Sequence, residues 1–424
     1  MTDKNTQEKN AVPLNIFWLG FLIYILSHAI AQSGNVNYAL CNVFQLLGMT
    51  MFIPSTIFLI RIRIDNKYLG SLYVIFLLWT TGVILRGIKF DYNSVKVLLF
   101  NPLIGLFPYL VPVMLLFPKR PAFIKKMFQV IILMGIFYLV LCLVFIKDLL
   151  ARYNEVKSQG LIEVFTQNLA LPCGFVLFTS IYHSGRRKWF TLSVIIIAFL
   201  FVVIRARRGL MGLTFSILFL SFLFYQYVNK TKVIYVIISI FIITLVSAAA
   251  VKIYNNNRKD TFNLITERIG KDTKSAVENY FYKDLKSEDW LIGKGINGRY
   301  FCPGVTEGMG RISVYRSVIE TGYLQIILNG GIVSLVLILL IMIPAIVKGL
   351  FYSKNLLSKA AAAWIVMFFI YEYPGIPSIF SLNYILVWIS IGICYSKELC
   401  QIPENKMTSL LRQKDKPVSE DWQV

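Results

Sequence analysis

The sequence predicts an all-α polytopic membrane protein with about twelve transmembrane helices and one large outer loop. Of the 424 residues, 57% are hydrophobic and only 15% are charged, and the mean hydropathy is +0.65. This composition is typical of chains that expose apolar surface to lipid, and it excludes an ordinary soluble domain. Apolar runs of about 20 residues, the length that crosses a bilayer, recur along the chain.

The predicted elements follow in order from these apolar runs. Residues 1–12 are expected to form a cytoplasmic tail; because no small-residue cleavage site follows a short apolar core, no removable signal peptide is expected. Nine helices lie within 13–251, the outer loop occupies 252–318, three helices lie within 319–396, and residues 397–424 form a second cytoplasmic tail. The twelve expected spans are 13–31, 39–60, 68–85, 97–117, 127–146, 163–182, 189–204, 210–228, 233–251, 319–347, 359–371 and 378–396.

Basic residues set the predicted orientation. With the N-terminus inside, the short inner connections after the fourth span carry twelve Lys and Arg, and the short outer ones carry six. Positive charge concentrates on the cytoplasmic side of short loops. This balance argues against a re-entrant reading of span 97–117, which its three prolines could otherwise break. The net charge of +21 is therefore interpreted as contact with anionic lipid, and no nucleic-acid partner is expected.

The large outer loop shows two local patterns. Several apolar positions have helical spacing, which predicts one or two amphipathic helices lying on the outer surface. The stretch WLIGKGINGRYF (290–301) contains glycines at three positions, and such a turn-rich segment is able to approach a ligand closely. The helical pattern rests on Phe262, Ile265, Ile269, Tyr280, Phe281 and Leu285.

The cluster RARRG (205–209) is the strongest candidate site. It lies in a predicted outer connection, where positive charge is not needed for orientation. Arg205, Arg207 and Arg208 could bind phosphate oxygens bidentately, and the next helix opens at Gly209 with amides that favour anions. These residues indicate a ligand that carries a diphosphate outside the cytoplasm. The alternative is that the arginines snorkel to lipid headgroups at a helix junction.

A second candidate site lies where the loop returns to the membrane. Arg316 and Glu320 are four residues apart and are expected to share one helix face, flanked by Tyr315 and Tyr323 at interface depth. Glu320 could deprotonate or orient a sugar hydroxyl as a general base. The alternative is an interfacial ion pair within an aromatic belt.

Three further outer-face residues are substrate-binding candidates. Arg86 ends the third span, Arg299 lies in the glycine-rich stretch, and Glu372 lies between two tyrosines in the last outer turn. Such side chains line carbohydrate sites but are also ordinary interface residues. The six Cys and two His show no ligand spacing, so no metal, zinc site or other cofactor is expected.

Three segments together resemble one family. They are RARRG with the apolar helix that follows (205–228), LIGKGINGRYF (291–301) and ETGYLQIILNGGIVSLVLIL (320–339). The chain resembles, over about residues 163–396, the O-antigen and capsular polysaccharide repeat-unit polymerases, a superfamily that includes the O-antigen ligases.

The resemblance implies a metal-independent glycosyltransferase in the bacterial cytoplasmic membrane, with an active site that faces outward. Its donor is an oligosaccharide linked through a diphosphate to a polyprenyl carrier, commonly undecaprenol, and its acceptor is another lipid-linked repeat unit. A chain-length regulator is a possible partner. Arg205, Arg207 and Arg208 match the family's outer-face arginines, which stabilise the leaving diphosphate, and Arg316 is a further candidate for that role.

Alternatives remain open at this point. The ligase branch has a histidine near the return of the loop to the membrane, and residues 311–323 contain none, which favours a polymerase and leaves Glu320 as the acceptor-activating group by elimination. A lipid-linked oligosaccharide flippase would more often carry charges inside its bundle and needs no large outer loop. A transferase of another fold would use an early acidic pair, which residues 32–38 lack.

Overall fold

The computed structural model describes residues 2–412 except for residues 63, 152–154, 230–272, 304–305, 308–310 and 313. The chain is 78% helical, which confirms the all-α prediction. Seven of the described helices are long and apolar enough to cross a membrane, and each coincides with a predicted span. They are α1 (Thr2–Ala31, apolar from Val12), α2 (Tyr38–Leu59), α3 (Lys67–Gly87), α6 (Pro121–Val144), α10 (Gly185–Ile204), α11 (Arg208–Val228) and α16 (Gly322–Phe351).

Four segments depart from the expectation of twelve uninterrupted spans, two because they are broken and two because their helices are short, and the span expected at 233–251 lies outside the described residues. Span 97–117 is broken into three pieces. Pro108 and Pro112 each stand near the start of a new helical piece, because proline lacks the N–H that would continue the preceding turn. The pieces are α4 (Tyr92–Phe100), α5 (Phe107–Leu110) and the 3₁₀ helix η1 (Val111–Leu116).

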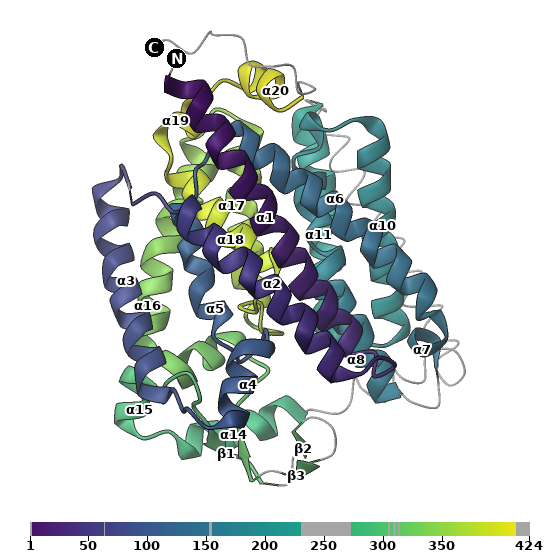
Figure 1. The fold of residues 1–424 in the computed structure, drawn as a ribbon, viewed down its shortest axis with the longest axis vertical. Helices are drawn as coiled ribbons and strands as arrows, with labels where there is room; N and C mark the ends of the chain where they lie inside the picture. The colour runs from purple at the N-terminus through teal and green to yellow at the C-terminus, as the bar shows by residue number, and fades with distance from the viewer. Residues whose placement is uncertain are drawn as a thin grey trace.

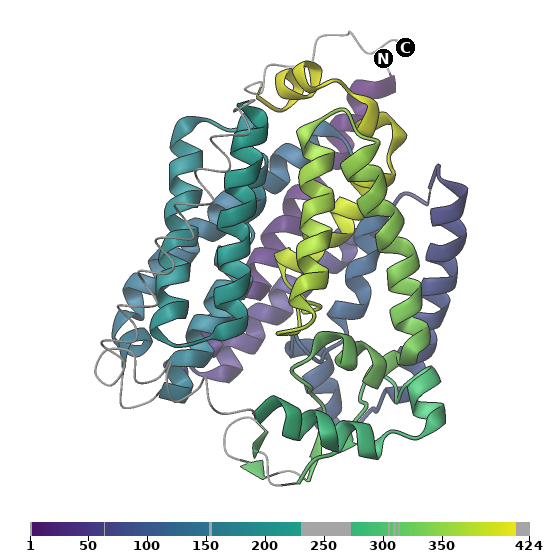
Figure 2. The same cartoon turned by 180° about the vertical axis from the view of Figure 1, so that it is seen from behind.

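The other three departures are one interrupted helix and two short ones. Span 163–182 is interrupted and contains a π turn; it consists of α8 (Glu155–Phe165), η2 (Thr166–Ala170), α9 (Cys173–Phe178) and η3 (Ser180–Tyr182). Helices α17 (Leu356–Tyr371) and α18 (Leu382–Tyr395) are apolar but short, and nearly all of their residues are buried. Figure 2 shows α17 and α18 in yellow-green between the teal α10–α11 pair and α16. Irregular backbone at membrane depth is tolerated where protein covers it, which is the case here.

The connections between helices gather at two opposite ends of the bundle (Figure 1). At one end, Arg61 N donates to Leu116 O (3.0 Å), and Lys354 N donates to Cys400 O (2.8 Å). The amphipathic helix α20 (Glu404–Arg412) covers this terminal end, which also holds α19 (Lys397–Gln401). The basic connections that were predicted to share one membrane face lie, in their described parts, at this end of the bundle. The prediction that they group together is therefore confirmed.

The opposite end carries a folded cap made from the described part of residues 273–321. Its own small core buries Phe281 in the helix α14 (Thr273–Asp284), Leu285 just after that helix, and Tyr300 in the strand β1 (Tyr300–Phe301). The helix predicted around residues 280–285 is therefore confirmed. The residues Phe262, Ile265 and Ile269 lie outside the described residues. The cap contains α14 (Thr273–Asp284), α15 (Ser287–Ile292), the antiparallel pair β1 (Tyr300–Phe301) and β4 (Tyr315–Arg316), and the antiparallel pair β2 (Thr306–Glu307) and β3 (Arg311–Ile312).

The connection between α17 and α18, residues 372–381, is held in place by an aromatic cluster. The Phe380 ring lies 5.4 Å from that of Phe21, 5.3 Å from that of Tyr24 and 5.0 Å from that of Phe107. In addition, Phe380 N donates to Pro102 O (2.8 Å). Edge-to-face and tilted ring pairs at these separations are favourable beyond their buried area. This α17–α18 turn is therefore fixed against α1 and the broken span.

Candidate functional site

The α17–α18 turn is the place where predicted site segments meet. A Cβ atom added to Gly209, in the RARRG corner, would lie 3.0 Å from Pro374 O. Gly322 N, at the start of α16, donates to Glu372 O (2.7 Å). Lys274 Nζ of the cap donates to Tyr373 O (2.6 Å) and stands 4.3 Å from the centre of that ring. The arginine corner (205–209), the start of α16 and the cap thus converge on one short turn.

Within the arginine corner, Arg205 is held by the backbone of another segment. Its side chain is 2% exposed. Nε and Nη2 donate to Leu149 O at 3.0 and 2.9 Å, and Nη2 also donates to Ala151 O at 3.0 Å. These carbonyls end α7 (Ile146–Leu150) and would otherwise lack intrahelical donors. Arg205 therefore positions the corner against α7.

Arg207 and Arg208 occupy the start of α11. Ala206 has a φ of 53°, the left-handed conformation, so the chain turns sharply between Arg205 and Arg207. Arg207 Nη2 forms an ion pair with Glu163 Oε2 at 2.5 Å, and both side chains are partly exposed. Its buried Nε has no hydrogen-bond partner among the described residues. Arg208 is exposed.

Glu163 is a site residue that the sequence analysis did not identify. One helical turn after it, Gln167 Nε2 donates to the Tyr371 hydroxyl (3.1 Å), so the same stretch that pairs with Arg207 also touches the end of α17. Residues four apart share a helix face, and this spacing of Glu163 and Gln167 is a signal that could have identified the pair.

Glu372 is buried at the centre of the turn. Its side chain is 4% exposed, and neither carboxyl oxygen has a hydrogen-bond partner among the described residues. Burial raises the pKa of this carboxyl well above its ordinary value. Gly322 leaves the space that the carboxyl occupies, because a Cβ atom at Gly322 would overlap Oε2 of Glu372.

The predicted helix face shared by Arg316 and Glu320 is wrong. Arg316 lies in β4, opposite Tyr300, whereas Glu320 lies in the connection before Thr321, the N-cap of α16. Gln325 holds this connection out of helical conformation, because its Oε1 accepts from Ile319 N (2.8 Å) and its Nε2 donates to Ser317 O (3.1 Å).

The two side chains also differ in exposure. Arg316 is 8% exposed with its Nε unpartnered among the described residues, and Glu320 is exposed. Thr321 Oγ1 donates to Glu278 Oε1 of α14, which ties the start of α16 to the cap.

The contacts of the α17–α18 turn with the arginine corner, the start of α16 and the cap are here called the junction. Some of the remaining predicted residues lie at this junction and others lie outside it. Tyr323 follows Gly322 and packs on the cap core. Tyr315 is exposed and stands edge-to-face with Phe301 at 5.8 Å. Arg86 lies outside the junction at the end of α3, where Nη2 donates to Ile292 O (2.6 Å), and exposed Arg299 accepts through its carbonyl from Lys294 Nζ (3.2 Å).

The glycine-rich segment 292–298, here called the glycine strap, contacts backbone. Gly293 and Gly295 have φ angles of 72° and 83°, as a turn-rich segment requires, and the predicted close approach to a ligand stays a prediction. What they approach is α16, since Lys294 N donates to Leu328 O (2.7 Å) and Gly295 N donates to Asn329 O (2.9 Å). The strap also reaches α3, since Ile296 N donates to Val83 O (3.1 Å).

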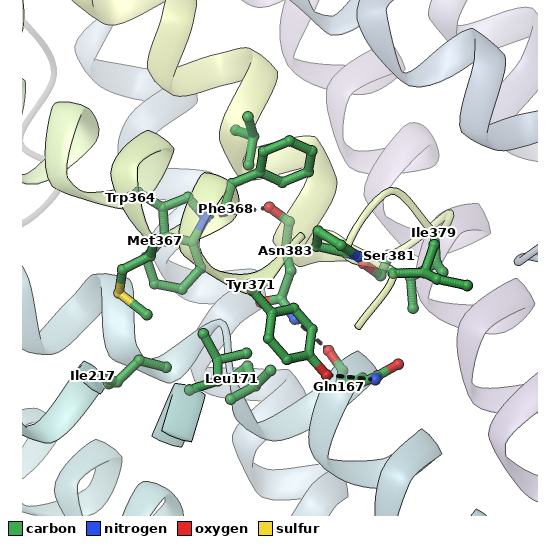
Figure 3. A pocket seen from close by; sticks show the side chains of 14 residues that line it. Gln167, Leu171, Ile217, Trp364, Met367, Phe368, Tyr371, Ile379, Ser381 and Asn383 are labelled. Atoms are coloured by element: carbon green, nitrogen blue, oxygen red, sulfur yellow. Dashed lines mark hydrogen bonds between the residues drawn. The ribbon is translucent and has the colours of Figure 1, made fainter. Parts of the chain in front are cut away.

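Two cavities flank the α17–α18 turn. The first, about 460 Å³, is mainly apolar and lies next to the arginine corner, between η2, α11, α17 and α18. Figure 3 shows the Tyr371 hydroxyl directed at Gln167, with Leu171 and Ile217 close by. The second, about 650 Å³, lies between α3, the broken span and α16. Ile376 lines both, so the turn is a shared wall.

Among the described residues, no three or more His, Cys, Asp or Glu side chains are grouped so as to hold a metal ion. No protein-family model, curated protein or solved structure matches this chain. The arrangement of residues around the α17–α18 turn is therefore the basis on which a function is inferred.

Proposed function

We propose that this protein is a membrane glycosyltransferase that polymerises polyprenyl-diphosphate-linked oligosaccharide repeat units into a surface polysaccharide. The observation that carries this proposal is the convergence of the arginine corner, the buried Glu372 and the cap on one turn. A diphosphate donor requires fixed cations, and an acceptor hydroxyl requires a nearby carboxylate. The arginine corner supplies the cations, and Glu320, two residues before the Gly322 contact with the turn, supplies the carboxylate, in a chain that resembles such polymerases over the same segments.

The donor diphosphate binds at Arg207 and Arg208. The ion pair with Glu163 fixes the position of the Arg207 guanidinium. The N-terminus of α11 adds a dipole that is favourable for an anion. Preorganised cations stabilise a leaving group as negative charge develops on it in the transition state. Arg205 contributes indirectly by fixing the corner to α7.

The acceptor hydroxyl is activated by Glu320, which is exposed two residues before the Gly322 contact with the turn. Its oxygen attacks the donor's anomeric carbon while the bond from that carbon to the phosphate oxygen breaks. The hydroxyl proton passes to Glu320, and the polyprenyl diphosphate leaves with its negative charge against the arginines. Burial raises the pKa of Glu372, which favours the neutral carboxyl, and a neutral carboxyl can supply a hydrogen-bond donor beside this step.

The proposed site faces outward from the bacterial cytoplasmic membrane. The described basic connections lie together at the terminal end, opposite the cap, as the rule for cytoplasmic loops would require. The cap then covers the outer end of the bundle, where lipid-linked glycans are joined.

The test is a gel ladder of surface polysaccharide from a strain that lacks only this gene, complemented with variants. Arg207→Ala is expected to reduce polymer on the order of 100-fold or more, because it removes a cation from the leaving group. Arg186→Ala is the matched control; this exposed arginine begins α10 at the terminal end, and a normal ladder is expected.

The uncomplemented strain separates the alternatives. A surface glycolipid with one repeat unit and no ladder supports a polymerase. Finished polymer left on the lipid carrier would indicate a ligase, and repeat units trapped on the cytoplasmic face would indicate a flippase. A wild-type ladder with Arg207→Ala, at equal protein level, would contradict the role given to the arginine corner.

A further inference from the structure

The second cavity lies across the α17–α18 turn from the apolar cavity next to the arginine corner, and it has a different chemistry. Its lining side chains supply hydroxyl and amide groups, and none of the described lining residues carries a formal charge. About 650 Å³ of space not filled by atoms, part of it open to solvent, lies between its walls. The polar lining residues are Thr80, Tyr109, Gln325, Asn329, Ser334, Ser378 and Tyr384.

The walls of this cavity are fixed from outside. Helix α16 bends at Gly331, whose φ is 69° and whose ψ is −178°. The Leu328 and Asn329 carbonyls next to the bend accept from the glycine strap, and the Gly330 carbonyl accepts from Trp79 Nε1 (3.1 Å). Helices broken at membrane depth are tolerated where they line a cavity. The backbone around the bend is thus satisfied without a ligand.

Several lining side chains remain available to a ligand. Thr80, only 8% exposed, and Ser378 form no side-chain hydrogen bond with another described residue. Tyr109 and Asn329 both line the cavity, and a phenol and an amide can each donate and accept hydrogen bonds. Rings of Phe76, Tyr109 and Tyr384 add apolar faces.

We propose that this cavity is a subsite for a neutral saccharide unit; resting on the proposed function, it holds the acceptor glycan while the arginine corner holds the donor diphosphate. Sugar rings present hydroxyls that both donate and accept hydrogen bonds, and apolar faces that pack on aromatic rings. A phosphate or uronate would lack a counter-charge here and would lose its hydration without compensation. Because Ile376 lines both cavities, a glycan seated here ends beside the junction.

The test uses purified full-length protein in lipid nanodiscs and saturation-transfer NMR. The probes are glucose, galactose and N-acetylglucosamine and their disaccharides, compared with glucose 1-phosphate and glucuronate. Neutral sugars are expected to bind with millimolar affinity. Thr80→Val removes one hydroxyl and is expected to weaken binding roughly fivefold. Thr80→Leu also fills the space and should weaken it more than about tenfold.

Thr81→Leu is the matched control. Thr81 is the next residue of α3, but it is exposed and its hydroxyl donates to Leu77 O (2.9 Å) within the same helix. Unchanged binding is expected. Thermal unfolding of all three variants confirms that each is folded, and Thr80→Val, which is isosteric, keeps the test valid if Thr80→Leu does not fold.

Any of three results would overturn the subsite. The first is no saturation transfer to any neutral sugar at sugar concentrations of tens of millimolar. The second is sugar binding by the folded Thr80 variants that equals wild type, and the third is binding of the charged sugars as strong as that of the neutral ones. The cavity would then hold water or another ligand. The readout requires no turnover, so the two proposals fail separately. A normal ladder from Arg207→Ala together with loss of sugar binding in Thr80→Leu would contradict the polymerase proposal and support the subsite.

Discussion

The two sides of the α17–α18 turn differ in how they satisfy polar groups. On the corner side, charged side chains predominate: Arg205 is bound to the carbonyls of Leu149 and Ala151, and Arg207 is paired with Glu163. On the side of the second cavity, the described lining groups are neutral hydroxyls and amides. Charges at membrane depth are costly unless they are paired, whereas neutral groups can face a small wet cavity. One short turn therefore separates a region suited to an anion from a region suited to a neutral polyol.

The neutral side depends on the bend in α16, and Gly331→Ala is the largest perturbation expected. A Cβ atom there would overlap Leu291 O, and the φ of 69° with a ψ of −178° is a conformation essentially restricted to glycine. A loss of more than about 4 kcal/mol in the free energy of unfolding is expected. Heat-challenged size-exclusion chromatography of the detergent-solubilised protein measures the effect.

Gly82→Ala is its control, because a Cβ atom at Gly82 in α3 would have no neighbour within 4 Å. Alanine there should be neutral or slightly stabilising, by up to about 1 kcal/mol. If Gly331→Ala were as stable as Gly82→Ala, the bend would not be an obligatory part of the cavity wall.

On the charged side, Arg205→Ala separates positioning from catalysis. Three hydrogen bonds from a buried guanidinium would be lost and Ala151 O would lose this donor, whereas Leu149 O would keep Ser158 Oγ; the expected cost is about 3 kcal/mol of stability. The temperature of thermal unfolding should therefore fall. The amount of polymer formed per folded molecule should fall less than it does with Arg207→Ala.

Arg86→Ala provides the comparison for this variant. Arg86 also donates to a carbonyl, that of Ile292, but it is exposed, so a loss below about 1 kcal/mol is expected. If Arg205→Ala were as stable as wild type, the positioning role of Arg205 would be contradicted. Arg205 would then again be a candidate for binding the ligand.

Between the two sides, Glu372 should make stability depend on pH. Its pKa is raised above the ordinary value of 4.5 by burial, so the folded protein binds more protons than the unfolded chain above that pH. Stability is therefore expected to fall as the pH rises from 4.5 toward the raised pKa, with a slope of up to about 1.4 kcal/mol per pH unit.

The measurement is the difference in unfolding temperature between wild type and Glu372→Gln across the pH range 5 to 8. The glutamine variant lacks the titrating group, so the difference should vary with pH. Parallel curves would mean that Glu372 titrates normally and finds a partner in the folded protein.

Much of the architecture could be predicted from local patterns, and the broken segments show where this ends. Seven spans were predicted correctly because length and hydrophobicity decide them. The charge balance favoured an intact span 97–117 despite Pro102, Pro108 and Pro112, and this prediction is wrong, because the span is broken into three helical pieces. By contrast, the predicted helical pairing of Arg316 with Glu320 is wrong, because Gln325 and Glu278 hold that connection from elsewhere in the chain.

The sequence by itself determined the all-α membrane class, the grouping of the basic connections at one end and the choice of candidate residues. Hydrophobic length, charge and residue chemistry are properties of local segments, so they can be read without a fold. Only the tertiary structure decided that Arg205 binds carbonyls, that Glu372 is buried beside Gly322, and that the α17–α18 turn separates two cavities. These features are contacts between segments far apart in the chain, and a buried group's partner and protonation are set by whichever segment packs against it.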